Sequence, residues 1–175
     1  MNYKKACPAK LAERSRGFTL LELLVVVAII GLLTTVVLVS LTNARNKGGD
    51  AGVKSNLRNA ISQGEIFYGT NTVVSNSYTS VCTNGLVGGA MGIGSFVLTA
   101  AKANGYTYSD TNGVGNRNPS AGGSTSTATC NDSANAWAAE VPLKSAGANQ
   151  MWCVDSVGKS KQENNSTIGA GTACN

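Results

Sequence analysis

The residues best placed to do chemistry lie at the start of a long apolar run. Glu22 is the only charged residue from Phe18 to Leu41, and it follows Phe18 by four positions. A carboxylate inside a membrane span costs on the order of 2.5–3.5 kcal/mol, so it needs a compensating partner. Cleavage between Gly17 and Phe18 would supply one, because the new α-amine of Phe18 is a cation at the helix start. We expect Glu22 to pair with that amine, on its own chain or on a neighbouring copy.

The cysteines offer a second chemistry. Cys7 precedes the apolar run, and four more follow it: Cys82, Cys130, Cys153 and Cys174. An even number of cysteines in an exported segment indicates two disulfides, and three pairings are open. No C-x-x-C pair occurs, so we do not expect these cysteines to bind a metal.

The sequence lacks the combinations of residues that the common catalytic sites require. The chain contains no histidine, which excludes Ser-His-Asp and Cys-His catalysis and zinc sites that use histidine. The glycines at 88–94 do not fit the spacing of a phosphate-binding loop. We therefore expect no enzymatic activity and no cofactor.

The element that positions Glu22 is the apolar run itself, residues 18–41. At about 1.5 Å per residue, a helix over these residues covers roughly 36 Å, enough to cross a hydrocarbon core of about 30 Å. The sequence predicts a transmembrane helix here. A cleaved secretory signal and a plain uncleaved anchor are the alternatives, but a secretory apolar region is shorter and uninterrupted.

Charge sets the expected orientation of this span. Five of the 14 basic residues and one of the nine acidic residues precede residue 18, so the rest of the chain has a net charge of +1. Basic residues beside a span tend to stay in the cytoplasm, which predicts that the C-terminal domain lies outside. Arg45 and Lys47, on the far side of the span, weaken this pattern without reversing it.

The stretch Gly17-Phe18-Thr19-Leu20-Leu21-Glu22, with a basic leader before it and a long apolar run after it, resembles the class III signal of type IV pilins and pseudopilins. The resemblance implies that a prepilin peptidase cuts after Gly17 and that the new terminus, Phe18, is methylated. It also implies that Glu22 is the carboxylate required for assembly of subunits into a helical filament.

The same resemblance implies an α+β pilin fold, in which a long N-terminal helix packs on a small antiparallel C-terminal sheet. It favours the disulfides Cys82–Cys130 and Cys153–Cys174, because a disulfide-closed C-terminal segment is common in pilins. Asp155 is a weak candidate for a calcium ligand, as acidic residues are in certain pseudopilins; a single carboxylate in a polar turn is ordinarily just solvated.

We expect a leader at 1–17, the span and assembly helix at 18–41, and a globular domain at 42–175. Within that domain we expect a helix at 42–68, a loop region at 69–130, and a sheet with a disulfide-closed C-terminal region at 131–175. An apolar stripe at helical spacing supports the helix. A short helix is expected at 96–103, and strands at 106–108, 136–143, 150–155 and 159–163. A polar loop is expected at 109–129.

The expected function is that of a structural subunit of a type IV pilus. Its partners would be its own copies in the filament, the prepilin peptidase and the inner-membrane assembly machinery. It would lie first in the cytoplasmic membrane and then in the extracellular filament. A pseudopilin of a type II secretion system is one alternative, and a membrane-anchored extracellular binding module is another. A net charge near zero gives no reason to expect nucleic-acid binding.

Overall fold

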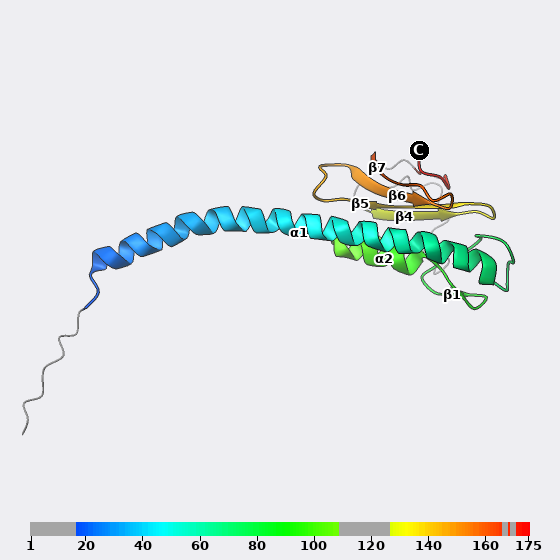
Figure 1. Ribbon diagram of the computed structural model, residues 1–175, viewed down its shortest axis with the longest axis horizontal. Helices are drawn as coiled ribbons and strands as arrows, with labels where there is room; N and C mark the ends of the chain where they lie inside the picture. The colour runs from blue at the N-terminus through cyan, green and yellow to red at the C-terminus, as the bar shows by residue number, and fades with distance from the viewer. Residues whose placement is uncertain (1–16, 109–126, 166–167, 169–170) are drawn as a thin grey trace, which may run out of the picture. The chain divides into compact units, whose positions relative to one another are not determined.

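The computed structural model describes residues 17–108, 127–165, 168 and 171–175. Most of the expected leader, and most of the loop expected at 109–129, lie outside the described residues. The chain divides into two compact units, Met1–Ser40 and Leu41–Asn175. Helix α1 (Leu20–Thr70) begins in the first unit and ends in the second (Figure 1).

In the first unit, the helical residues from 20 to 40 are exposed throughout. This part of α1 is long and apolar enough to cross a membrane. The helix continues through Gly31, although glycine is a poor helix former. The hydroxyl groups of Thr34 and Thr35 donate hydrogen bonds to the carbonyls of Ile30 and Leu32, at 2.7 and 2.8 Å. Both hydroxyls are thereby satisfied within the helix, which suits an apolar environment.

In the second unit, α1 buries one face. The buried positions include Val53, Leu57, Ala60, Gly64 and Phe67, which confirms the predicted stripe. Their spacing of three or four residues keeps them on one side of the helix. The indole of Trp137, itself fully buried, lies against this face, so a Cβ at Gly64 would come within 2.8 Å of its Nε1.

Within the described residues, five strands form one sheet beside this half of α1 (Figure 1). They are β3 (Thr107–Tyr108), β4 (Thr127–Asp132), β5 (Trp137–Pro142), β6 (Gln150–Asp155) and β7 (Ser160–Asn164), in that spatial order. The β4–β5, β5–β6 and β6–β7 pairs are antiparallel, whereas β3 pairs with β4 in parallel. The sheet is therefore mixed at one edge rather than wholly antiparallel.

Both faces of the sheet are buried. Residues such as Cys130, Ala139 and Val154 belong to the main core shared with α1, whereas Ala138 and Cys153 pack with Ile168 and Cys174 in a second cluster. Neighbouring residues of a strand point to opposite faces, so β5 and β6 each contribute to both clusters. The C-terminal segment covers part of the face turned away from α1.

The expected loop region at 69–130 contains more structure than predicted. A small hairpin, β1 (Leu86–Val87) and β2 (Ala90–Met91), precedes helix α2 (Gly94–Ala103). The short helix and the strand at 106–108 had been expected, but β4 begins at Thr127, inside the stretch predicted to be a loop. The prediction of a loop at 127–129 is therefore wrong. These residues pair with β5, and the register Thr129↔Glu140 sets their place in the sheet.

Candidate assembly site

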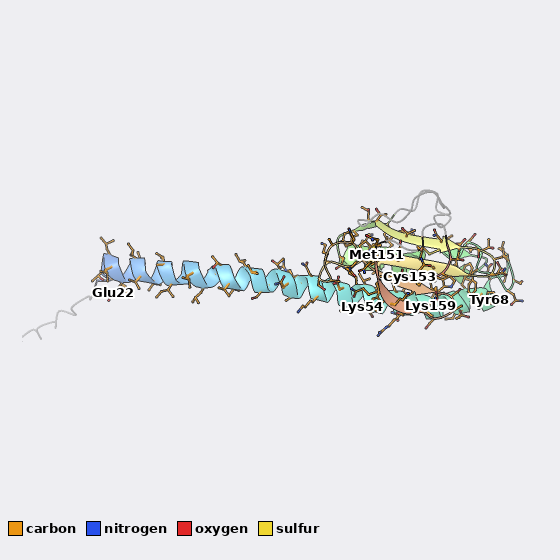
Figure 2. All side chains as sticks on the ribbon, turned by 90° about the horizontal axis from the view of Figure 1, so that it is seen from above. Glu22, Lys54, Tyr68, Met151, Cys153 and Lys159 are labelled. Atoms are coloured by element: carbon orange, nitrogen blue, oxygen red, sulfur yellow. A yellow bond between two sulfur atoms is a disulfide. The ribbon has the colours of Figure 1, made fainter. Side chains whose placement is uncertain are left out.

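Glu22 lies in the first turn of α1 and is held there by Thr19 (Figure 2). The Thr19 N–H and hydroxyl donate to Glu22 Oε2 at 2.9 and 3.0 Å. In return, the Glu22 N–H donates to Thr19 Oγ1 at 3.2 Å. This reciprocal arrangement is a capping box, which satisfies backbone N–H groups that lack partners at a helix start. Thr19 was not predicted to have a role, although the Thr-x-x-Glu spacing in the sequence is its signal.

The capping box leaves one carboxylate oxygen available. Both hydrogen bonds from Thr19 end on Oε2, and within the described part of the chain no donor reaches Oε1. A negative charge at the first turn of a helix is also favoured by the helix dipole. The site can therefore accept a cation at Oε1 without releasing Thr19.

The expected processing junction is open to solvent. Gly17 is exposed and Phe18 is 87% exposed. A Cβ added to Gly17 would have no neighbour within 4 Å, so packing does not require a glycine here. In the uncut chain the nitrogen of Phe18 is a peptide amide, so its predicted pairing with Glu22 as an amine stays a prediction.

The four cysteines of the globular unit form two disulfides, Cys82–Cys130 and Cys153–Cys174, with Cα–Cα distances of 5.7 and 5.9 Å. These are the pairs favoured from the sequence. The first joins the segment before the β1–β2 hairpin to strand β4. The second ties the C-terminal segment to β6.

Asp155, the weak candidate for a metal ligand, is occupied by backbone donors. It is 1% exposed. Its Oδ1 accepts the N–H groups of Val157 and Lys159 at 3.1 and 3.0 Å, and its Oδ2 accepts the Cys174 N–H at 3.1 Å. Within the described residues, it has no acidic or cysteine partners that would complete a metal site. We assign Asp155 to closing the β6–β7 turn and to holding the C-terminus.

Asp50 is a buried structural residue that the sequence analysis missed. The sequence analysis gave this charged residue no place in the core, yet it is only 4% exposed. Asn104 and the Lys144 N–H donate to its Oδ1 at 2.6 and 2.8 Å, and the Ser145 N–H donates to its Oδ2 at 2.9 Å. The Ser145 hydroxyl also donates to Oδ2. Its position three residues before Val53, in register with the apolar stripe, is the signal that could have revealed its burial.

The hydrogen bonds to Asp50, which we call the Asp50 network, connect three elements: α1, the end of α2 and the β5–β6 turn. Burial alone would raise the pKa of Asp50, but hydrogen bonds from Ser145, Lys144 and Asn104 outweigh it and hold the pKa below its ordinary value. Burial and the nearby Asp50 charge raise the pKa of Tyr106. Asp50 is thus held as a carboxylate at this junction.

Comparisons with known proteins agree with the resemblance of the N-terminus to the pilin signal. Residues 13–38 match the model of the prokaryotic N-terminal methylation motif. The chain is 32% identical, over 94 residues, to the type IV wide pilus major component PilA4 of Thermus thermophilus. That alignment covers 54% of this chain and 71% of the relative. No solved structure matches the chain.

Proposed function

Because the chain belongs to the type IV pilin family, we propose that it is a structural subunit of a type IV pilus. In this proposal a prepilin peptidase cuts after Gly17, Phe18 becomes the methylated N-terminus, and the subunit polymerises through the first half of α1. Before assembly it is a single-pass protein of the cytoplasmic membrane, and afterwards it is part of an extracellular filament.

The observation that carries the proposal is the exposed apolar half of α1 with one carboxylate fixed at its start. Side chains such as Leu20 and Leu32 are 88% and 69% exposed, so something outside the chain must cover them. Lipid and a bundle of identical helices are similarly apolar, and burial alone hardly distinguishes the two environments. A directional contact is therefore needed to set the register between subunits.

Glu22 can provide that contact. Thr19 fixes its carboxylate through Oε2, so Oε1 is the oxygen that can receive the Phe18 amine of a neighbouring copy. The amine exists only after cleavage, which would make assembly depend on processing. A charge-assisted hydrogen bond in an apolar, water-poor surrounding is stronger than one at a hydrated surface.

The test is the Glu22→Ala variant, expressed with the complete assembly machinery. We expect normal processing and normal amounts of protein in the membrane, but at least a tenfold loss of filaments recovered by shearing. Thr35→Ala is the matched control, since the Thr35 hydroxyl donates to the Leu32 carbonyl of its own helix. Filament recovery at the wild-type level from Glu22→Ala would overturn the proposal. Electron microscopy of the sheared material distinguishes long surface pili from the short rods of a secretion system.

A further inference from the structure

Four exposed cations gather at the end of the globular unit where the chain enters it. Arg45 and Lys47 follow residue 41 on α1, Lys102 lies in the last turn of α2, and Lys144 lies in the β5–β6 turn. All four are exposed, and within the described residues none has an acidic partner. We call these residues the basic collar.

Contacts between elements bring the members of the collar together. A Cβ at Gly49 would lie 3.0 Å from the Ala103 carbonyl oxygen, so the end of α2 abuts α1 just after Lys47. Asp50 accepts the Lys144 N–H at 2.8 Å, which places the β5–β6 turn at the same level of α1. Figure 1 shows this turn at the end of the sheet where α1 enters the unit.

The carboxylates near this end do not neutralise the collar at the surface. Asp50, Glu140 and Glu163 are 4%, 0% and 7% exposed. Asp50 is occupied by its donors, and Glu163 pairs with Lys161 at 3.2 Å. The described surface at this end is thus cationic, although the processed chain as a whole is nearly neutral.

Tyr106 adds an amphipathic ring to the collar. It is half-buried, and Lys144 Nζ lies 5.5 Å from the centre of its ring. Tyrosine and tryptophan are enriched at the level of lipid headgroups, where one end of the ring is apolar and the other hydrated. Lysine and arginine contribute most to electrostatic attraction when they lie within a Debye length of anionic lipid.

We propose that the basic collar binds the anionic headgroups of the extracytoplasmic leaflet while the subunit waits in the membrane. Arg45 follows Leu41 by four residues, or about 6 Å of helix, and so lies at headgroup depth. This inference rests on the proposed membrane-anchored stage, but not on the filament. It also explains why Arg45 and Lys47 lie on the extracytoplasmic side of the span. The tendency of basic residues to stay on the cytoplasmic side does not predict them there.

Lysine acylation offers a direct test, with an internal control. The full-length chain would be placed at one copy per lipid nanodisc, in neutral phosphatidylcholine or with about 30% phosphatidylglycerol, and treated with an acylating reagent. We expect anionic lipid to slow acylation of Lys47, Lys102 and Lys144 at least about threefold, and high salt to remove the effect. Lys159, whose carbonyl accepts the Asp155 N–H at the opposite end of β6, should react equally in both lipids.

A double variant sharpens the result. Lys102→Gln combined with Lys144→Gln should reduce the protection of Lys47, whereas Lys159→Gln should not. Equal acylation of Lys47 in both lipids would overturn the proposal. So would protection that requires several copies per disc, because the partner would then be a second subunit.

The outcome is independent of the filament experiment. Glu22→Ala should keep the lipid-dependent protection of the collar while losing filaments. Equal acylation of the collar in both lipids, in a chain that still assembles into filaments, would refute only the lipid contact.

Discussion

At the scale of single residues, Thr19 and Glu22 act as one unit. The Thr19 N–H and hydroxyl both hold Glu22 Oε2, and this fixes the carboxylate before any neighbour arrives. Fixing the side chain beforehand reduces the entropy lost on pairing. We therefore regard Thr19 as a positioning residue for the proposed assembly contact.

Replacing Thr19 tests this role. Thr19→Ala removes the hydroxyl contacts and should reduce sheared filaments several-fold, because loss of an N-cap costs about 1 kcal/mol. Thr19→Ser keeps the hydroxyl and should assemble nearly as wild type. The measurement is filament yield relative to processed subunit in the membrane, with Thr34→Ala as the control. Equal yields from the Ala and Ser variants would contradict the positioning role.

Asp50 leads to a prediction about stability and pH. Its folded pKa is lowered, so its contribution to stability is present above the ordinary pKa of an aspartate and is lost as pH falls through the folded value. Asp50→Asn should reduce the free energy of unfolding at pH 7 by about 2 kcal/mol, because charge-assisted hydrogen bonds are lost. The deficit should shrink as pH falls below about 4. Melting followed by tryptophan fluorescence from pH 3 to 7 checks this; a pH-independent deficit would contradict it.

At the scale of elements, the close contact between α1 and β5 requires a glycine, which has no side chain, at position 64. A Cβ at Gly64 would lie 2.8–2.9 Å from three atoms of the Trp137 indole. The tryptophan is fully buried and cannot move aside without disturbing the core. The glycine thus lets the helix and the sheet approach closely.

Two alanine substitutions in the same helix should have opposite effects. Gly64→Ala should destabilise the domain by about 1–2 kcal/mol, because overpacking outweighs the gain in helix propensity. Gly48→Ala, where a Cβ meets nothing within 4 Å, should stabilise it by up to about 1 kcal/mol. Thermal melting gives both values. Destabilisation of equal size in the two variants would show that the Trp137 contact is not responsible.

How far the sequence predicts the structure differs between elements. The apolar stripe of α1, the short helix at 96–103 and the strands at 136–143, 150–155 and 159–163 were predicted because period and turn residues mark them. Strand β4 was missed because its Thr-Ala-Thr-Cys-Asn-Asp sequence is small and polar. Its burial comes from pairing with β5 on one edge and from a partner distant in the chain, Gly171, whose carbonyl accepts the Asn131 amide at 3.0 Å.

The residues of the candidate sites likewise differ in whether the sequence or only the tertiary structure reveals them. The motif of the assembly site is local, so Gly17, Phe18 and Glu22 could be proposed from the resemblance of this short stretch to the class III signal. The basic collar could not, since Lys102 and Lys144 join Arg45 and Lys47 only through tertiary contacts. The burial of Asp50 likewise depends on donors 54, 94 and 95 residues away along the chain.

At the scale of the whole molecule, the two units should behave independently in folding. The residues of α1 before Leu41 are exposed, so the core of the second unit does not depend on them. Gly17→Ala should therefore leave the melting midpoint of the globular unit within about 1 °C of wild type. The same variant should remain uncut, with a mass that includes residues 1–17. Mass spectrometry and melting in detergent check both; a methylated Phe18 terminus in this variant would contradict the cleavage assignment.

The Asp50 network also bears on how the protein ages. Asparagine followed by glycine is the pair whose side-chain amide hydrolyses most readily, through a ring closed by the next backbone nitrogen, and such residues are thermolabile. Asn104 precedes Gly105, but its amide donates to Asp50 and to the Pro142 carbonyl, at 2.6 and 3.2 Å. The Gly105 nitrogen would attack the Asn104 side chain, but its N–H donates a hydrogen bond to the Lys102 carbonyl at 2.9 Å. Folding should thus protect this position from deamidation, whereas the denatured chain should deamidate there readily.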